Sequence, residues 1–464
     1  MWWALASCTQ RESVVQAPHE EPGWTDPFTY STIHLPPDGD AALGFAGPRP
    51  RNVLMLSIDT TRRDHFGDTY TPFLAGQSRQ GVNLADHQQC SNWTYASTSC
   101  TLNGRYHEEN GFVPQLSALF QAPMPDGQRT LATRLRDRGY HTILLSTNGW
   151  LGPKWNNAQG YLDAPTPFTS NATVLGNEGK ARLLELQPDQ PWFLHLHFIE
   201  PHPPYNPPAA YLDEVASLPP LPEGIDVTTQ QGQYAANADW PEMTEEERDL
   251  LEAHLRGRYH GELRYLDDQL AALWADFEAS GFLSDTLVVV WTDHGEQFWE
   301  HDQQSHAYFL GAEENDGVAF FWSHNLPASE WTEPTHAVDL APTVLEAVGF
   351  PPDPTEFWFS GYVLGTAPDE RPRFAMSVAR LGPLQSVTLD GWKLTFNFAG
   401  VVRLYDRNTD PEELVDLYET DPENEHVLPL WTLLRPRIEL LSALVPTRPL
   451  VWPEGLPGPG QPVE

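Results

Sequence analysis

Four short apolar runs, each ending in polar or ionisable side chains, constrain the fold of this chain more than any other feature. The runs are NVLMLSID (52–59), HTILLSTN (141–148), WFLHLHFIEPH (192–202) and TLVVVWTDHG (286–295). Apolar runs of this length that alternate with helical patterns are typical of a parallel sheet with helices on both faces. The sequence therefore predicts an α/β fold with a mostly parallel central sheet.

Helical patterns separate and follow these runs. Residues 129–140 and 256–281 place apolar side chains at helical spacing, and 334–350 has the pattern of a last short helix. Further on, 386–418 alternates like antiparallel strands, with turns expected at Asp390-Gly391 and Ala399-Gly400. We expect this part to form a small C-terminal antiparallel α+β subdomain.

The chain divides into five predicted segments. They are a remnant of a lipoprotein signal (1–8), a proline-rich linker or strap (9–50), the main α/β domain (51–350), the C-terminal antiparallel subdomain (351–445) and a loosely held tail (446–464).

The N-terminus MWWALASCTQ is similar to a bacterial lipoprotein signal, in which the cysteine, here Cys8, is lipidated. This interpretation predicts attachment to a membrane and a place in the bacterial cell envelope or outside the cell. An ordinary N-terminus is the alternative, because the apolar stretch is short and lacks basic residues before it. An oxidising compartment would allow a disulfide between Cys90 and Cys100, and two buried thiols are the alternative.

The charge of the chain limits its partners. It has 64 acidic and 27 basic residues and a formal net charge of −37. Most of such a surface repels phosphate backbones and anionic lipid headgroups. We therefore expect no nucleic-acid partner.

Polar side chains gather where the four predicted strands end. They are Asp59, Asn148, Glu200, His202, Asp293 and His294. The carboxyl ends of parallel strands meet at one edge of a sheet, where such folds bind ligands. Carboxylate oxygens, an imidazole nitrogen and a hydroxyl together suit a divalent cation, and a hydroxyl on that cation becomes a nucleophile near neutral pH. Thr94 in CSNWTYASTSCTLNGRY is the candidate hydroxyl.

Five blocks, in this order, carry a family resemblance. They are NVLMLSIDTTRRDHFG, WTYASTSCTLNGRYHEENG, FIEPHPPYNPP, LVVVWTDHGEQFWEHDQQSH and HAVDLAPTVLEAVG. The set resembles the sulfatase family of the alkaline phosphatase superfamily over roughly residues 51–425, with GWKLTFNF and LYDRNTDPEEL similar to its C-terminal subdomain. The resemblance implies an alkaline phosphatase-like fold and a sulfatase-like catalytic domain over 51–350.

The resemblance also implies roles for single residues. The implied metal ligands are Asp59, Thr94, Asp293 and His294. The implied catalytic residues are Thr94 as nucleophile with His202 and His306, and the implied substrate-binding residues are Arg62 and Asn148. Three other histidines are interpreted as buried strand-face or satisfied loop residues, namely His195, His197 and His301.

The chain departs from the family pattern at the nucleophile. Sulfatases usually carry C-x-P-S-R or S-x-P-S-R, whose first residue becomes formylglycine, whereas this chain has Thr94-Tyr95-Ala96-Ser97-Thr98. Threonine cannot form that aldehyde, so no formylglycine is expected. The first strand ends Asp59-Thr60 where many sulfatases have Asp-Asp. The loss of a carboxylate, with His294, favours zinc or manganese, and calcium is the alternative.

These observations predict a metal-dependent hydrolase acting on a small anionic ester. A sulfated threonine would have to be cleaved by water at sulfur, whereas a phosphorylated threonine beside a metal is a more tractable intermediate. Thr94 therefore favours a phosphate, phosphonate or phosphodiester substrate over a sulfate ester. Two alternatives stay open, a catalytically inactive sulfatase-like binding protein and an envelope phosphoryl transferase.

Overall fold

The computed structural model of the chain describes residues 42–112, 122–167, 171–215, 218–351, 359–377, 383–444, 450–459 and 461. All of them belong to one compact unit, Thr32–Glu464. Cys8 and the predicted lipoprotein signal lie outside the described residues, so lipidation stays a prediction. Among the described helices, none is both long and apolar enough to cross a membrane.

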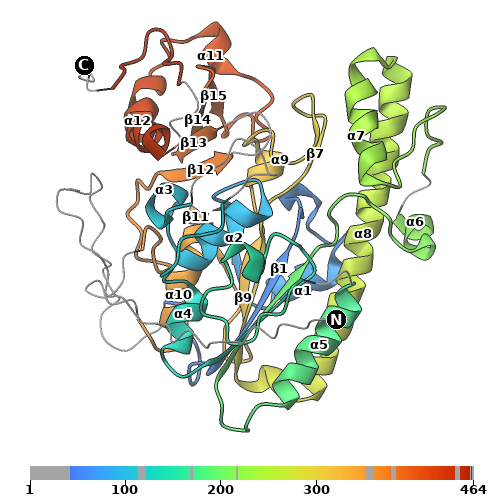
Figure 1. The fold of residues 1–464 in the computed structure, drawn as a ribbon, viewed down its shortest axis with the longest axis vertical. Helices are drawn as coiled ribbons and strands as arrows, with labels where there is room; N and C mark the ends of the chain where they lie inside the picture. Colours follow the sequence, from blue (N-terminus) through green and yellow to red (C-terminus); the bar gives the residue numbers. More distant parts are fainter. Residues whose placement is uncertain are drawn as a thin grey trace, which may run out of the picture. The chain divides into compact units, whose positions relative to one another are not determined.

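A seven-stranded sheet lies at the centre of the structure (Figure 1). Its members, in spatial order, are β10 (Ser329–Trp331), β2 (Val82–Leu84), β9 (Ala319–Trp322), β6 (Thr286–Thr292), β1 (Asn52–Ile58), β5 (Trp192–Phe198) and β4 (His141–Ser146). Neighbours pair in parallel except at β9, which is antiparallel to both β2 and β6. The mostly parallel sheet is confirmed, and the four predicted strands are its adjacent members β6, β1, β5 and β4.

Helices cover both faces of this sheet, as the alternation of buried side chains along β1 requires. Val53 and Met55 join the core under one face, while Leu54 and Leu56 join the core under the other. The first face carries α2 (Thr94–Asn103), α4 (Leu131–Arg136) and α10 (Leu340–Ala347). The second carries α1 (Pro72–Ser78), α5 (Ala172–Leu184) and α8 (Glu245–Ala279) (Figure 1). The predicted arrangement of helices is therefore confirmed.

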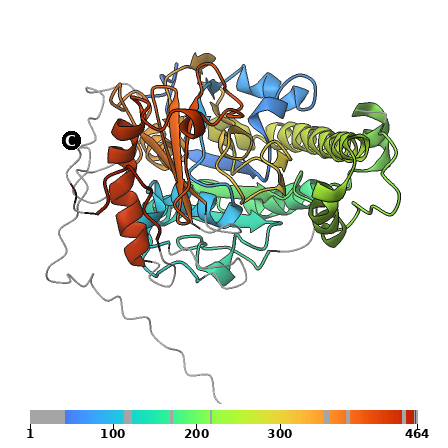
Figure 2. The ribbon, with the colours of Figure 1, turned by 90° about the horizontal axis from the view of Figure 1, so that it is seen from above.

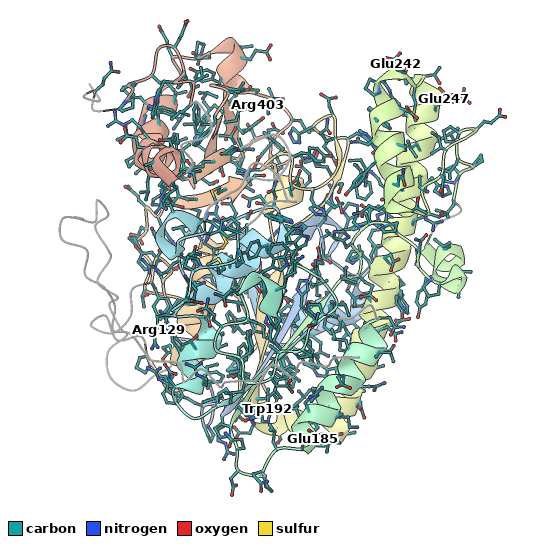
Figure 3. All side chains as sticks on the ribbon, in the orientation of Figure 1. Arg129, Glu185, Trp192, Glu242, Glu247 and Arg403 are labelled. Carbon is teal, nitrogen blue, oxygen red and sulfur yellow. A yellow bond between two sulfur atoms is a disulfide. The ribbon has the colours of Figure 1, made fainter. Side chains whose placement is uncertain are left out.

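Helix α8 is longer than its apolar spacing predicts. The pattern predicts a helix from residue 256, but α8 begins at Glu245 because Thr244 and Glu247 form a capping box. The N-terminal part of α8 pairs with α7 (Gln230–Asp239) beyond the sheet, and Glu242 and Glu247 lie at its far end (Figure 3). Leu251 and Leu255, in this N-terminal part of α8, are fully buried in a core cluster that includes Ala236 of α7.

The C-terminal subdomain is a separate antiparallel sheet. Its strands are β12 (Arg373–Ser377), β13 (Leu384–Leu389), β14 (Trp392–Asn397) and β15 (Val402–Asp406). The predicted turn between β13 and β14 has Asp390 at φ 51° and Gly391 at φ 78°, the left-handed values of a tight hairpin turn. Helix α12 (Val427–Leu444) packs along this sheet (Figure 2). The α+β subdomain is therefore confirmed.

The remaining elements are short. The small strands are β3 (His87–Gln88), β7 (Gln297–Phe298), β8 (Gln304–Ser305) and β11 (Thr335–His336). The small helices are α3 (His107–Asn110), α6 (Ala209–Val215), α9 (Ala312–Asn315) and α11 (Leu417–Thr420).

The described ends of the chain pack on its main body. Leu43 is buried in the core beneath α2, α4 and α10, as a strap would be. In the tail, Val451 N donates a hydrogen bond to Phe398 O, and Trp431 Nε1 donates to Pro457 O. The described part of the tail is thus held by the subdomain, whereas the sequence suggested a loose segment.

A charged cluster joins the two parts of the molecule. His301 lies in the main domain, with Nδ1 at 2.8 Å from Glu313 Oε1 and Nε2 at 3.0 Å from the Glu413 carbonyl oxygen in the subdomain. Burial disfavours its charged form, but these oxygens outweigh burial and raise the pKa of His301 to about 9. His301 is therefore a satisfied loop histidine that holds its charge at neutral pH.

We predict that His301→Gln lowers the free energy of unfolding most at low pH. The pKa of His301 is raised on folding, so its contribution is complete below about pH 6.5 and is lost as pH rises through about 9. Chemical unfolding of the wild type and the variant, at fixed ionic strength from pH 6 to 9.5, measures the difference. A difference independent of pH would contradict the ionic role of His301.

Candidate active site

Three strands of the central sheet, β1, β6 and β4, deliver polar side chains to one edge of the sheet. Asp59 directly follows β1, Asp293 and His294 follow β6, and Asn148 comes two residues after β4. The opposite edge is marked by Trp192 at the start of β5 (Figure 3). The convergence expected at the carboxyl ends of the strands is therefore present.

Three of the predicted metal ligands form one buried group. Asp59, Asp293 and His294 each offer a ligand atom, and these atoms lie within 4.8 Å of one another. Asp59 Oδ1 and Asp293 Oδ2 are buried without a hydrogen-bond partner among the described residues. His294 Nδ1 lies 2.9 Å from the Gly295 carbonyl oxygen. This contact places the proton on Nδ1 and leaves Nε2 as a ligand atom. The group fits a divalent cation.

The two carboxylates of this group differ in their affinity for a proton. Burial opposes ionisation of Asp59, but the nearby His202 and His197 side chains outweigh it and lower the Asp59 pKa. Burial and the adjacent Asp59 charge raise the pKa of Asp293 well above its ordinary value. Two anionic carboxylates at this spacing repel each other unless a cation lies between them.

Thr94 is the first residue of α2 and faces this group. Its Oγ1 lies 3.4 Å from Asp59 Oδ2 and 3.4 Å from His294 Nε2. Asn148 Nδ2 donates to Thr94 Oγ1 at 3.2 Å and to Asp59 Oδ2 at 2.5 Å. Asn148 Oδ1 accepts from Trp150 N, which fixes the orientation of the amide. The predicted nucleophile and one predicted substrate-binding residue thus lie beside the candidate metal ligands.

Two further hydroxyls of α2 donate hydrogen bonds to backbone oxygens. Thr98, where the family pattern has arginine, donates its hydroxyl to the Thr94 carbonyl oxygen at 2.6 Å. Ser97 Oγ donates to the Asp293 carbonyl oxygen at 2.5 Å. Helix α2 is therefore tied to the strand β6 that carries two candidate ligands.

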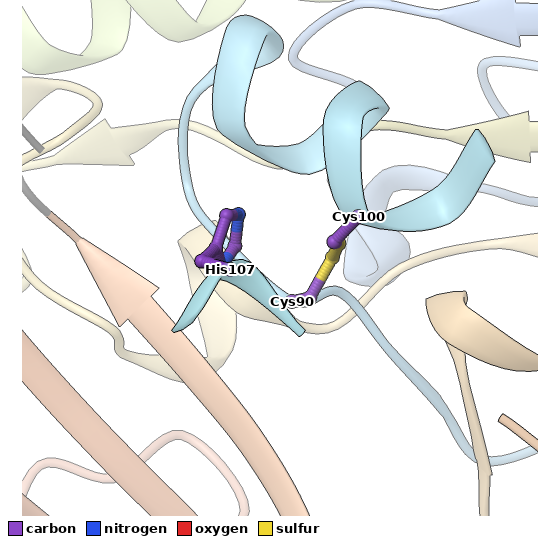
Figure 4. A group of neighbouring side chains, drawn as sticks. All are labelled: Cys90, Cys100 and His107. Carbon is purple, nitrogen blue, oxygen red and sulfur yellow. A yellow bond between two sulfur atoms is a disulfide. The ribbon is translucent and has the colours of Figure 1, made fainter. Parts of the chain in front are cut away.

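A disulfide braces the start of α2. Cys90, before the helix, is joined to Cys100 within it, and His107 lies beside the pair (Figure 4). The His107 ring contacts the Ala96 carbonyl oxygen through Nε2 at 2.9 Å. Burial lowers the pKa of His107 to about 4, so it is neutral. With both sulfurs in a disulfide, these three residues are no metal centre, although their atoms lie close together.

Two predicted catalytic histidines lie in a row of rings next to the candidate ligands. The ring centroids of His294 and His306 are 4.4 Å apart, and those of His306 and His202 are 5.1 Å apart. His306 Nδ1 lies 3.3 Å from the buried Glu296 carboxylate. Sequence reasoning missed Glu296, although it follows Asp293 by only three residues in TDHGEQ. A carboxylate behind an imidazole orients the ring.

Arg62 has other partners. Its guanidinium contacts both Asp64 and Glu300, and its Nη1 donates to the Glu296 carbonyl oxygen. Its side chain is only 5% exposed. The structure thus places Arg62 in an ion-pair network beneath the site, and substrate contact by Arg62 stays a prediction.

His197 is a second residue that sequence reasoning missed. It was interpreted as a buried strand-face residue, and its side chain is indeed fully buried. However, its Nε2 lies 3.5 Å from Asp59 Oδ2. The sequence signal that could have found His197 was the HLH pattern. Alternate residues of a strand share one face, so His195 and His197 lie on the same side of the sheet.

Comparison with known proteins identifies the family. Residues 51–350 match the sulfatase family, so the chain belongs to this family of metal-dependent ester hydrolases. The resemblance of its sequence motifs is therefore confirmed.

Three relatives illustrate the similarity. Choline-sulfatase from Rhizobium meliloti (strain 1021) is 23% identical over 79% of this chain and 82% of its own length. The multifunctional alkaline phosphatase superfamily protein PehA from Trinickia caryophylli is 25% identical over 43% of each chain, so the chain spans less than half of that relative. Phosphonate monoester hydrolase from Silicibacter pomeroyi shares the fold, with a TM-score of 0.62 and 20% identity over 84% of this chain and 94% of that one.

We predict that Asp293→Asn reduces the bound divalent metal to well below one ion per chain, because it removes one of the two anionic ligands. Elemental analysis of purified protein measures the metal, and Glu330→Gln, at an exposed acidic residue of β10, is the control. Equal metal content in Asp293→Asn and the control would contradict the assignment of this centre.

Proposed function

We propose that this chain hydrolyses a small anionic ester of phosphorus, a phosphate, phosphonate or phosphodiester, through a covalent intermediate on Thr94. The observation that carries the proposal is the position of Thr94 Oγ1, within 3.4 Å of both Asp59 Oδ2 and His294 Nε2. A hydroxyl so close to a candidate cation site is placed to act as a nucleophile.

The chemistry of threonine favours phosphorus over sulfur. A formylglycine hydrate releases sulfate by collapsing to an aldehyde, and Thr94 has no such route. A phosphothreonine can be opened by water at phosphorus, which regenerates the hydroxyl. The phosphonate monoester hydrolase fold and the similarity to the multifunctional protein PehA support this substrate class. The similarity to choline-sulfatase makes a sulfate ester the second candidate.

The residues of the site have complementary roles in this reaction. Asp59, Asp293 and His294 would hold a divalent cation, which would lower the pKa of a bound hydroxyl and offset charge on the transferred group. Thr94 Oγ1 forms a bond to phosphorus while the bond to the leaving oxygen breaks. Asn148 Nδ2 is a hydrogen-bond donor toward the reacting oxygens. Water then attacks phosphorus and frees Thr94.

A protonated histidine supplies the proton that the leaving oxygen needs. His306 is the better candidate, because its ring lies next to that of His294 and the Glu296 carboxylate beside its Nδ1 orients it. His202 Nδ1 lies 2.7 Å from the Pro203 carbonyl oxygen, a contact that orients its ring toward the same row. We propose His306 as the general acid and His202 as a residue that contacts the transferred group.

The donor set favours a particular metal. Two carboxylates, one imidazole and one hydroxyl are a mixed oxygen and nitrogen set, typical of zinc or manganese rather than of calcium.

For the location of the protein, we propose the bacterial cell envelope or the extracellular space. The Cys90–Cys100 disulfide supports an oxidising compartment, and lipidation of Cys8 is the proposed means of attachment.

We predict that Thr94→Ala lowers kcat by at least about a thousandfold on the preferred aryl ester, because no other hydroxyl takes its place. Turnover of aryl phosphodiesters, phosphonates and sulfates identifies that ester, and metal analysis of the same samples should give equal metal in both proteins. Thr94→Ser should keep measurable activity.

Thr98→Ala is the matched control, because Thr98 lies one turn further along α2 and bonds only to backbone oxygens of its own helix. It should keep activity close to that of the wild type. Full activity in Thr94→Ala would disprove the nucleophile. A metal-loaded wild type that turns over none of these esters would instead support a binding protein, and transfer to an added alcohol in preference to water would support a transferase.

We predict that His306→Gln impairs reactions with poor leaving groups more than those with good ones. Without a proton donor, an alkoxide must leave unprotonated, while a nitrophenolate needs little help, so the loss should approach about 10²- to 10⁴-fold for alkyl esters only. A plot of log kcat against leaving-group pKa measures the change in slope. An unchanged slope in His306→Gln, with a steeper slope in His202→Gln, would reverse the two assignments.

A further inference from the structure

Buried polar side chains link the interior of the sheet to Asp59. In order, the members of this buried polar chain are Tyr161, His195, Ser57 and His197. Ser57 lies on β1, while His195 and His197 lie on β5, all on the sheet face that α2 covers. Ser57, His195 and His197 are fully buried. Unpaired polar groups at such depth would lower the stability of the fold, so we expect each of these groups to be hydrogen-bonded to the next.

The contacts are short and continuous. Tyr161 Oη lies 2.9 Å from His195 Nδ1, and His195 Nε2 lies 2.8 Å from Ser57 Oγ. Ser57 Oγ lies 2.8 Å from His197 Nδ1. The last atom, His197 Nε2, has no hydrogen-bond partner at shorter range and lies 3.5 Å from Asp59 Oδ2. The chain therefore ends on a candidate metal ligand.

The number of protons fixes the direction of these bonds. An ionised carboxylate only accepts hydrogen bonds, so Asp59 requires the proton of His197 on Nε2. His197 Nδ1 then accepts from the Ser57 hydroxyl. Ser57 has one proton and gives it away, so its oxygen accepts from His195 Nε2. His195 Nδ1 in turn accepts from Tyr161, which is the donor at the start. The ionised Asp59 selects this direction, because the reverse one would place the lone pair of His197 Nε2 against a carboxylate oxygen.

The environment of the outer members agrees with this direction. Burial lowers the pKa of His195 far below its ordinary value, so the ring is neutral and has one N–H. Burial raises the pKa of Tyr161, so the phenol keeps its proton. Both members thus have the protonation that the chain requires.

The two carboxylate oxygens of Asp59, where the buried polar chain ends, have different surroundings. Oδ2 is contacted by Asn148 Nδ2, Thr94 Oγ1 and His197 Nε2. Oδ1 has no hydrogen-bond partner among the described residues and lies 3.4 Å from the ligand nitrogen of His294. Contacts that hold one oxygen of a carboxylate leave the other directed at the cation.

We propose that the buried polar chain positions the Asp59 carboxylate for the divalent cation, with His197 as the donor to Oδ2. The members are positioning residues, since none of them faces the transferred group. The proposal rests on Asp59 being a metal ligand, as the proposed function requires. It adds that metal affinity depends on residues in the interior of the sheet.

Metal affinity, measured on chelator-treated protein by competition for Zn²⁺ or Mn²⁺ with a chromogenic chelator, tests the proposal without turnover. His197→Leu removes the donor at similar volume and should weaken the affinity about 10- to 100-fold. His197→Gln places an amide N–H near the position of Nε2 and should restore most of it. Ser57→Ala should weaken the affinity less than His197→Leu, because His197 stays but loses its fixed tautomer.

Val53→Ala is the matched control, since Val53 lies on the same face of β1 as Ser57 and outside the chain. It should lower the melting temperature and leave the affinity unchanged. Wild-type affinity in His197→Leu, or equal loss in His197→Gln and His197→Leu, would overturn the proposal. Equal loss in Val53→Ala would also overturn it, because the effect would then follow from stability alone.

Ring-nitrogen NMR gives a second readout that stability does not change. Spectra of ¹⁵N-histidine protein, assigned with the variants, should show both His195 and His197 as the Nε2–H tautomer. An Nδ1–H tautomer at His197 would contradict the proposed direction of the hydrogen bonds in the buried polar chain. A wild type that binds no metal would overturn the metal centre of the proposed function, whereas activity in Thr94→Ala would remove only the nucleophile and leave this test intact.

Discussion

Two carboxylates buried side by side impose the main constraint on this molecule. Asp59 and Asp293 end adjacent strands, and each has an oxygen without a hydrogen-bond partner among the described residues. Burial of two like charges is costly unless a cation or a proton compensates it. The surrounding groups follow from that requirement, because His294 offers a lone pair on the same side and Thr94 a hydroxyl. The arrangement therefore fits a site for a divalent cation.

The α2 segment depends on both parts of the molecule. Thr94, in its first turn, faces the candidate ligands, while Trp93 and Tyr95 belong to a core cluster that also includes Trp431 of α12. Ala96 and Thr98 stand where the family pattern has proline and arginine. At this helix the packing therefore comes from aromatic residues, and Thr98 bonds within the helix. The helix that carries the proposed nucleophile therefore packs on the subdomain, while the sheet carries the candidate metal ligands.

The sequence predicted the parts of the structure that have a local signal. The four long strands are mostly apolar because helices cover both of their faces, so their ends located Asp59, Asn148 and Asp293. Strand β9 has only four residues, and its antiparallel pairing depends on partners far along the chain. Likewise, HLH showed two histidines on one face, but only the tertiary structure shows that His197 reaches Asp59. The role of Glu296 likewise depends on a tertiary contact, since His306 lies on a separate turn of the chain.

The disulfide has a consequence for how the molecule opens. It closes a segment of ten residues, so it removes little entropy from the unfolded chain compared with a long loop. The disulfide instead acts locally, on the start of α2. The Cys90 carbonyl oxygen also accepts a hydrogen bond from Met376 N in β12. The start of α2 is thereby tied to a strand of the other sheet. Amides of this helix should then exchange with solvent in the same cooperative unit as the subdomain, and not through independent fraying.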